Sequence, residues 1–329
     1  LEAPLHDAAE FPSALPVRRE VDYAAWVTIQ IGCDNTCAFC IVPAVRGKEQ
    51  SRRLGDIVRD VEQLAADGVT EITLLGQNVN SYGRDLGAGQ YKPLFADLLR
   101  AMDAVPGIRR VRFTSPHPKD LRPETIAAMA ECASVCEHLH LPLQAGSDRT
   151  LARMHRGYKA ARYLERLAAA RAAIPDLAVT TDLIVGFPGE TEADFQATLD
   201  VVDEAAYDAA YTFVFSPRPG TEAAAWTDEF LPREVTAERM ARLTEVVERH
   251  ALARHQARIG RVEEVLVEGP SKKDPSVTTG RTRQNKLVHF AAAGIVPGDY
   301  TTVRVSSAAP HFLRGAPVAE RVPVAVSAL

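Results

Sequence analysis

Six short β-prone runs, each followed by a stretch with helical periodicity, constrain the fold of this chain more than any other feature. The runs lie at residues 26–31, 71–75, 110–114, 138–141, 177–185 and 210–215. Repeated strand-then-helix units predict parallel strands joined by right-handed crossovers, in either an open doubly wound sheet or an incomplete barrel. We favour the incomplete barrel. In both architectures the site belongs at the carboxyl ends of the strands.

The pattern changes after Gly260, where short β-rich stretches are separated by Pro and Gly. This pattern predicts a small all-β barrel of roughly five strands. The expected fold class is therefore α/β, a partial (βα)6 barrel followed by a small all-β barrel. The expected parts are a linker at 1–20, an α/β domain at 21–258, the β-barrel at 259–322 and a tail at 323–329.

The composition is that of an ordinary globular protein, with 46% apolar and 25% charged residues. The formal net charge of −5 is unevenly distributed, because residues 258–329 carry about +4 and the preceding residues about −9. The basic C-terminal part is the one suited to a polyanion. No apolar run approaches the roughly 18 residues of a membrane helix and no leader is evident, so we expect a cytoplasmic protein that does not contact a membrane.

Three of the five cysteines, Cys33, Cys37 and Cys40, fall within eight residues as C-x3-C-x2-C. This crowding suits a metal better than a framework of disulfides. A complete zinc site or iron–sulfur cluster usually takes four protein ligands, and no fourth lies nearby in sequence. Three thiolates would leave one iron open to the amino and carboxylate groups of a methionine. A zinc loop completed from afar and a ferredoxin-like electron carrier remain alternatives. Cys132 and Cys136 are expected to be buried and inert.

The cysteine loop and several strand-end motifs resemble the radical domain of methylthiotransferases, which are radical S-adenosylmethionine (SAM) enzymes. SPHP and SPRPGTEAA are closer to the MiaB type, which modifies isopentenylated adenosine beside the tRNA anticodon, than to the branch that acts on a ribosomal-protein aspartate. The resemblance runs from about residue 21 to 322. Its segments are residues 26–53, 73–83, 112–121, 140–148, 180–195 and 215–224.

The resemblance implies a 4Fe–4S cluster held by Cys33, Cys37 and Cys40, with SAM on the open iron and no catalytic residue beyond the cluster ligands. For the polar residues at the strand ends, a tight turn or a surface ion pair is the alternative to SAM binding. Arg218 suits either the cofactor carboxylate or an RNA phosphate. Asp182 departs from the usual superfamily pattern, which weakens its assignment. The residues expected to bind SAM are Phe39, Gly76, Gln77, Asn78, Gln144, Asp182 and Arg218.

The C-terminal part resembles a TRAM domain, an RNA-binding module, and His289 or Phe290 is expected to add stacking. The implied partners are tRNA, an electron donor such as flavodoxin or ferredoxin, and a sulfur source. A solvated basic surface is the alternative for each cation. The expected RNA-binding residues are Arg46, Lys48, Arg52, Arg53, Lys272, Lys273, Arg281, Arg283, Lys286 and Arg304.

The family also places a further domain, with three more cysteines and an auxiliary 4Fe–4S cluster, before the radical domain. No cysteine precedes Cys33 in this chain. We therefore expect this chain to cleave SAM without completing methylthio transfer, and we expect the second cluster only in a full-length protein. A non-catalytic iron–sulfur protein that binds RNA is the alternative from another class.

Overall fold

The computed structural model describes residues 19–87, 92–291 and 294–318. Most of the predicted linker at 1–20, the last residues of the predicted β-barrel at 319–322 and the predicted tail at 323–329 lie outside the described residues. Within the described part, no helix is both long enough and apolar enough to cross a membrane.

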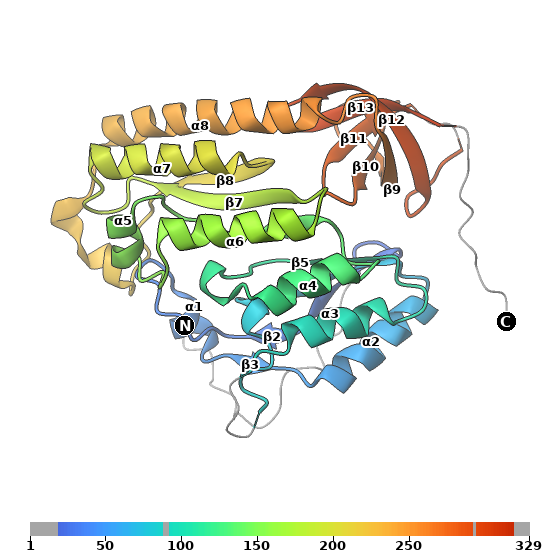
Figure 1. The fold of residues 1–329 in the computed structure, drawn as a ribbon, viewed down its shortest axis with the longest axis horizontal. Helices are drawn as coiled ribbons and strands as arrows, with labels where there is room; N and C mark the ends of the chain where they lie inside the picture. Colours follow the sequence, from blue (N-terminus) through green and yellow to red (C-terminus); the bar gives the residue numbers. More distant parts are fainter. Residues whose placement is uncertain (1–18, 88–91, 292–293, 319–329) are drawn as a thin grey trace.

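The α/β domain is a half-barrel of six parallel strands arranged in sequence order, which confirms the incomplete barrel. The strands form two sheets of three, and a parallel bridge between Val111 and Val135 joins them. Figure 1 shows the strands enclosed by the helices that follow them. The strands are β1 (Ala24–Thr28), β4 (Glu71–Leu75), β5 (Arg110–Phe113), β6 (His138–His140), β7 (Ala178–Val185) and β8 (Ala209–Val214).

The helices cover the outer face of these strands, and their ends follow local signals in the sequence. Thr191 and Asp194 form a capping box at the start of one helix. Residues 148–173 form two helices rather than one, because His155 and Gly157 take positive φ angles of 57° and 68°. The helices are α2 (Leu54–Ala66), α3 (Phe95–Asp103), α4 (Pro123–Glu131), α5 (Asp148–Arg153), α6 (Ala160–Ala173), α7 (Glu192–Ala205) and α8 (Arg233–Gln256).

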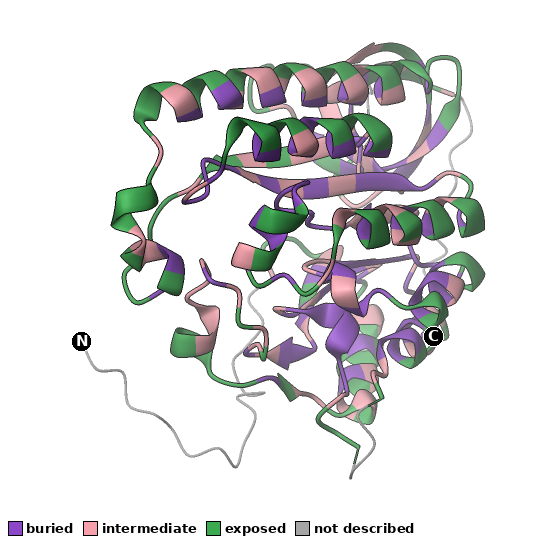
Figure 2. Ribbon diagram, turned by 60° about the vertical axis from the view of Figure 1, so that its left-hand side comes forward, coloured by how far each residue is buried: buried purple, intermediate pink, exposed green. Residues whose placement is uncertain are grey.

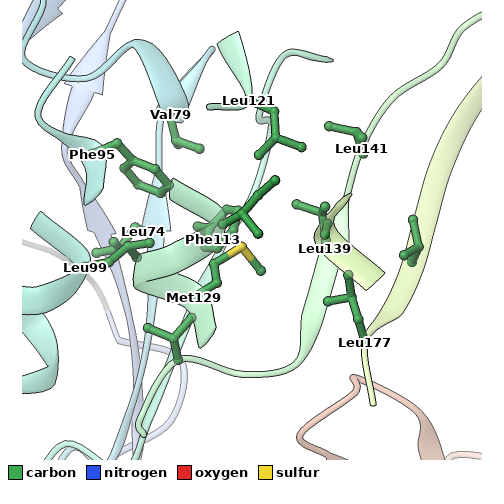
Figure 3. Close-up of a cluster of buried hydrophobic side chains, with 14 of the residues drawn as sticks. Leu74, Val79, Phe95, Leu99, Phe113, Leu121, Met129, Leu139, Leu141 and Leu177 are labelled. Atoms are coloured by element: carbon green, nitrogen blue, oxygen red, sulfur yellow. The ribbon is translucent and has the colours of Figure 1, made fainter. Parts of the chain in front are cut away.

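The core lies between the strands and this helical layer. Figure 3 shows Leu74 and Phe113 from the first sheet packed with Leu139 from the second, together with Phe95 and Met129 from the helices. Alternate residues of β7 point to the two sides of the wall, and the side toward the helices is buried while the other side is less so (Figure 2). The inner wall is therefore free to carry polar groups.

The first β-prone run is interrupted, and this difference from the prediction shapes the cysteine loop. The chain leaves β1 and forms β2 (Gln30–Ile31), which pairs antiparallel with β3 (Gln50–Ser51). Between them lie the three cysteines and the short helix α1 (Val42–Arg46). The pairing of β2 with β3 holds the two ends of the cysteine loop together.

The C-terminal part is a closed barrel of five strands, as predicted. Its core consists of alternating side chains such as Val265, Val288, Phe290 and Leu313. Phe290 is only 2% exposed, so the structure places it in the barrel core rather than at an RNA surface. The strands are β9 (Val262–Pro270), β10 (Thr278–Thr282), β11 (Leu287–Phe290), β12 (Tyr300–Ala309) and β13 (Phe312–Pro317).

This β-barrel packs against the amino ends of the half-barrel strands. The Tyr300 hydroxyl lies 3.2 Å from the Thr70 hydroxyl, just before β4, and the Arg110 guanidinium donates to the backbone carbonyl of Arg281 at 2.9 Å. Figure 1 shows the β-barrel beside one end of the strands and α1 near the other. The second domain therefore covers the end of the half-barrel opposite to the predicted site.

Candidate functional site

Segments that follow the six strands meet at one end of the half-barrel. The cysteine loop follows β1 and β2, and Gln144 and Gly186 follow β6 and β7. Parallel strands bring their carboxyl ends to one edge, which is why residues far apart in sequence gather there.

The cysteine loop is anchored through its backbone to two other strand-end segments. The Ala38 amide donates to the Met154 carbonyl at 3.2 Å, and the Ala38 carbonyl accepts from the Ala223 amide at 2.8 Å. The loop begins at Gly32, which has a φ of 71°, and a Cβ there would lie 2.0 Å from the Lys48 carbonyl oxygen. Only glycine fits this approach, so Gly32 sets the path of the chain into Cys33.

The three thiols of the loop are free and partly exposed. Burial raises the pKa of the Cys33 thiol. A hollow of about 360 Å³ adjoins the loop and is lined by Cys33, Asp34 and Lys48 among others. Among the described residues, no three His, Cys, Asp or Glu side chains are already arranged to hold a metal ion. Cluster binding therefore requires the cysteine side chains to turn toward a common point.

Arg156 is a residue of this site that the sequence reasoning missed. Its guanidinium is buried, at 6% exposure, and lies 3.3 Å from the sulfur of Cys37. The same guanidinium contacts the Tyr158 hydroxyl at 3.3 Å and the Pro142 carbonyl at 3.4 Å. A buried cation beside a sulfur favours the thiolate and compensates negative charge. No local pattern in the sequence marks this arginine, because Cys37 lies 119 positions away.

The loop residue Phe39 packs against protein rather than standing free. Its ring centroid lies 6.3 Å from that of Phe187 in an edge-on arrangement, and Phe187 in turn contacts Phe215 and Trp226. This aromatic cluster fixes the segment between Cys37 and Cys40. The structure thus gives Phe39 a role in holding the loop, and its predicted contact with SAM stays a prediction.

The segment after β4 is held by an internal hydrogen-bond network. The Asn78 side chain donates to the Asp120 carboxylate at 2.8 Å and accepts from the His117 amide at 3.2 Å. Both ends of this amide therefore have protein partners, which differs from the expected contact with SAM. Gly76 is buried, and a Cβ there would lie 2.7 Å from the Gln30 side chain. Gln77 is partly exposed, whereas Gly76 and Asn78 are buried.

Gln144 follows β6 and pairs with the neighbouring strand β7, on which Asp182 lies. Gln144 takes a left-handed φ of 70°, and its backbone bonds to Asp182 and Ile184 on the adjacent strand. A non-glycine residue held in this conformation costs energy, which is typical of a functional position. The Asp182 carboxylate lies 3.4 Å from the His140 ring. Arg218 is exposed in the loop after β8, and the roles proposed for all three stay predictions.

The cations near the cysteine loop fall into two groups. Arg46, Lys48 and Arg53 are exposed at or beside α1 and the start of α2. Arg52 instead donates to the Thr28 carbonyl at 3.2 Å and pairs with Asp60 at 2.6 Å. The structure therefore leaves three cations on the surface next to the loop and gives Arg52 a part in holding β1 to α2.

The cations of the β-barrel also fall into two groups, one at the domain interface and one at the surface. For the interface group the structure corrects the prediction from sequence. Lys286 is 5% exposed and its ammonium lies 2.6 Å from the Asp208 carboxylate at the amino end of β8. Arg283 bonds to the Glu137 carboxylate at 2.8 Å and to backbone carbonyls before β6. Because Lys286 is buried, the prediction that it binds RNA is wrong. Arg283 lies in the same domain interface, and its guanidinium is hydrogen-bonded there.

The remaining predicted cations of the β-barrel stay at its surface. Lys272, Lys273 and Arg304 are exposed, and Arg304 also donates to the Gly260 carbonyl at 3.1 Å. Arg281 is partly exposed and pairs with Glu268 at 3.0 Å. Sequence counting could not separate these side chains from the interface cations, because all of them lie in one basic stretch.

The donor set around the cysteine loop fits an iron–sulfur cluster. Three free thiols lie on an anchored loop, a buried guanidinium compensates charge at Cys37, and a hollow adjoins Cys33. Cys33, Cys37 and Cys40 would hold three irons, which leaves the fourth for the methionine end of SAM. Together the bound groups supply one-electron cleavage of the sulfonium to a carbon radical. The role of the chain is to hold these groups and to shield them through the packing of Phe39.

Comparison with known proteins agrees with this assignment. The radical SAM superfamily model matches residues 27–202 and the TRAM domain model matches residues 256–318. The chain is 56% identical to the tRNA-2-methylthio-N(6)-dimethylallyladenosine synthase of Acidothermus cellulolyticus, over 92% of this chain and 61% of that protein. It is 53% identical to the enzyme of the same name from Mycolicibacterium smegmatis, over 95% of this chain and 62% of that protein.

The chain thus spans about three fifths of the length of these curated relatives, 61% and 62%. Among solved structures, it is similar to the radical S-adenosylmethionine methyltransferase TsrM of Kitasatospora setae, with a TM-score of 0.49 and 18% identity over 60% of this chain and 38% of that one. The superfamily model covers more than half of the 329 residues, and the cysteine loop lies inside the match. The chain therefore belongs to the radical SAM superfamily, with the 4Fe–4S cluster and SAM that this membership implies, and it carries a TRAM domain.

Proposed function

We propose that this chain is the SAM-cleaving and RNA-binding part of an enzyme that adds a methylthio group to C2 of isopentenylated adenosine beside the tRNA anticodon. The relatives that carry the corresponding name match over more than nine tenths of this chain, 92% and 95%. The proposal concerns the activity of the whole protein, because the chain spans only 61–62% of those relatives.

The observation that carries the proposal is the position of the cysteine loop. Three free thiols lie at the carboxyl ends of parallel strands, where α/β enzymes build their sites. The TRAM domain closes the opposite ends of the same strands, so the site end stays accessible to a large substrate. A purely structural zinc site would need a fourth ligand, and the cysteine loop at residues 32–49 contains no histidine and no fourth cysteine.

Two further partners follow from the chemistry of the proposed reaction. Cleavage of the sulfonium consumes one electron, so a one-electron donor such as flavodoxin or ferredoxin must reach the cluster. Arg46 and Lys48 lie exposed beside the loop and suit either an acidic electron carrier or an RNA backbone. The methylthio group requires a sulfur source outside the described residues.

The first experiment measures cluster formation and SAM binding. Anaerobic reconstitution should give about four irons per chain, because three thiols and SAM complete a single 4Fe–4S cluster. The electron paramagnetic resonance signal of the reduced cluster should change when SAM is added, and deoxyadenosine and methionine should form. A signal that ignores SAM would favour a non-catalytic iron–sulfur protein instead.

Paired cysteine variants provide the matched control. Cys37→Ala should lose the cluster and all deoxyadenosine formation, because only two loop thiols remain. Cys132→Ala removes a buried thiol outside the loop and should retain both. Cluster loss in Cys132→Ala as well, with the fold intact, would argue against the loop as the cluster site.

The choice of substrate needs a separate test. Binding of an isopentenylated anticodon stem-loop should be tighter than binding of the ribosomal protein modified by the other branch of the family. The reverse preference would replace tRNA by the ribosomal-protein aspartate and leave the radical chemistry unchanged.

A further inference from the structure

A row of polar side chains lies on the inner wall of the half-barrel, across the paired strands β6 and β7. Leu139 and Leu183 on these strands are 0% exposed and belong to the core, so the residues that alternate with them face the opposite, inner side. All members of the row are partly exposed. The inner-wall row consists of His138, Thr180, His140 and Asp182.

Short distances connect the inner-wall row from end to end. The Thr180 hydroxyl oxygen lies 3.2 Å from Nε2 of His138 and 3.0 Å from Nδ1 of His140. The other ring nitrogen of His140, Nε2, lies 3.4 Å from a carboxylate oxygen of Asp182. The Tyr211 ring packs edge-on against His140, with the ring centroids 5.9 Å apart. These three partners fix the orientation of the His140 ring.

The donors and acceptors of these groups set one direction for the hydrogen bonds. An ionised carboxylate only accepts, so Nε2 of His140 carries the proton that faces Asp182. In the neutral ring Nδ1 is then an acceptor, and it takes the single hydroxyl proton of Thr180. The hydroxyl oxygen in turn accepts from His138, which is neutral because burial, and after it the Arg112 guanidinium, lowers the pKa of this ring to about 3. The row therefore ends on a carboxylate that receives an oriented donor.

The Asp182 carboxylate has capacity for a further donor. Among the described residues, His140 is the one hydrogen-bond or ion-pair partner of this carboxylate, and the Asp182 side chain is 28% exposed. An ionised carboxylate offers about four acceptor sites on its two oxygens. Because one oxygen already has a partner, the side chain loses less conformational entropy when the other oxygen binds a ligand.

We propose that the two imidazoles and the hydroxyl of the inner-wall row position Asp182, so that the second carboxylate oxygen accepts from an N–H or O–H group of SAM. His138, Thr180 and His140 are positioning residues that act through Asp182. The inference rests on the proposed function, which places SAM at this end of the strands, and on the predicted contact between SAM and Asp182. It assigns a role to three side chains that the resemblance to the family leaves without one.

The first test needs neither the cluster nor SAM. Nitrogen-15 NMR of the histidine-labelled chain at about pH 8.5, where an ordinary imidazole is neutral, reports which ring nitrogen carries the proton. His140 should be protonated at Nε2, and the His140→Gln spectrum identifies its resonances. Thr180→Val should shift the Nδ1 resonance of His140, because this nitrogen loses its donor, and Thr180→Ser should leave it in place. A proton on Nδ1 of His140 in the wild type would overturn the inference.

The second test measures the dissociation constant of SAM for the reconstituted protein by equilibrium dialysis. Asp182→Asn should weaken binding about 10- to 150-fold, the range for a hydrogen bond to a charged group. Thr180→Val should weaken it about 2- to 12-fold, and Thr180→Ser should stay within about twofold. The double variant Thr180→Val/Asp182→Asn should bind as Asp182→Asn does, because the hydroxyl acts only through the carboxylate.

Thr244→Val is the matched control, since it removes a hydroxyl that bonds to the Met240 carbonyl within α8. This variant should bind SAM as the wild type does, and thermal melting checks that every variant is folded. Wild-type affinity for SAM in Asp182→Asn or in Thr180→Val would overturn the inference, as would additive losses in the double variant. These outcomes leave cluster formation and SAM cleavage by the wild type intact, so they are distinguishable from failure of the proposed function.

The isopentenylated adenine also offers an N–H group, and a separate measurement distinguishes it from SAM. The affinity of Asp182→Asn for an isopentenylated anticodon stem-loop should equal that of the wild type. Weaker RNA binding with unchanged SAM affinity would assign the carboxylate to the RNA base and overturn the inference. A wild type that binds no SAM would overturn the proposed function and this inference together.

Discussion

The two ends of the half-barrel use charged side chains in opposite ways. At the amino ends of the strands, cations of both domains are buried at the domain interface with partners, as in the pair between Lys286 of the TRAM domain and Asp208 of the half-barrel at 2.6 Å. At the carboxyl ends, Arg46 and Lys48 remain exposed next to a loop of free thiols. One end is a fixed joint between two domains, and the other is an open site.

This contrast shows that the charge of a residue does not reveal its role. The buried Arg110 and Arg112 bond to TRAM backbone carbonyls at 2.9–3.0 Å and to carboxylates on both domains. Each of these interactions leaves a buried polar group unsatisfied if one partner is removed. Substitutions at the amino ends should therefore act on stability, whereas substitutions at the carboxyl ends should act on the cluster or on RNA.

The largest effect is expected at the domain joint. Lys286→Met should lower the free energy of unfolding by about 3–5 kcal/mol, because it leaves the Asp208 carboxylate buried without its partner. Urea titration measures the change, and Lys272→Met, which removes an exposed lysine, should stay within about 0.5 kcal/mol. Equal stability of the two variants would mean that the joint does not hold the domains together.

A smaller effect is expected at the open end, and it should appear in the cluster. Arg156→Gln should reduce iron retention about 10- to 100-fold, because outer partners of metal ligands typically carry that share of metal affinity. Iron remaining per chain is measured against increasing chelator. Arg153→Gln is the control, since Arg153 lies three positions away and pairs with Glu229. Iron retention that is the same in both variants would remove Arg156 from the site.

Acid should lower the stability of the folded protein, in part through a histidine at the joint. Burial and the Lys286 ammonium lower the pKa of His255 to about 4. The folded protein thus holds this ring neutral, while the unfolded chain takes up a proton near pH 6.5. The contribution to stability is complete above pH 6.5 and declines as the pH falls toward 4, by about 1 kcal/mol between pH 7.5 and 5.5.

The pH dependence can be assigned with one variant. His255→Gln should show a shallower loss of stability between pH 7.5 and 5.5 than the wild type in urea titrations. His117 and His138, whose pKa values burial also lowers, account for a remaining slope in both proteins. Identical slopes in the wild type and the variant would show that the titration of His255 does not contribute to the stability of the joint.

The smallest effect on stability is expected for the exposed cations at the open end. Arg46→Gln/Lys48→Gln should change the free energy of unfolding by less than about 0.5 kcal/mol, since neither side chain is buried. The same variant should lower the salt dependence of tRNA binding. A destabilisation comparable to that of Lys286→Met would erase the contrast between the two ends.

Local sequence signals were sufficient for most of the fold. Period-two and helical patterns located all six strands of the half-barrel, and Thr191 with Asp194 marked the start of α7. The spacing of Cys33, Cys37 and Cys40 indicated the cofactor because the three ligands share one short loop. In each case the information lies within about ten residues of chain.

The parts that sequence reasoning missed depend on partners that are distant along the chain. Lys286 lies 78 positions from Asp208, and Arg156 lies 119 positions from Cys37. The Asn78 amide is occupied by Asp120, 42 positions away. Until the strands are placed next to one another, a buried interface cation and a surface cation look the same. The antiparallel pairing of β2 with β3 was missed for a different reason, since each strand has only two residues and so carries no detectable period.

The TRAM domain covers the amino ends of the strands, so the length of the strands sets the distance between the TRAM domain and the cysteine loop. The strand β7 has eight residues, which at about 3.3 Å each and a typical barrel tilt corresponds to an axial height of roughly 20 Å. A ligand that touches both the barrel cations and the thiol loop must bridge at least that separation. A mononucleotide is too short to do so, whereas a folded polynucleotide can bind at one end and present a chosen base at the other.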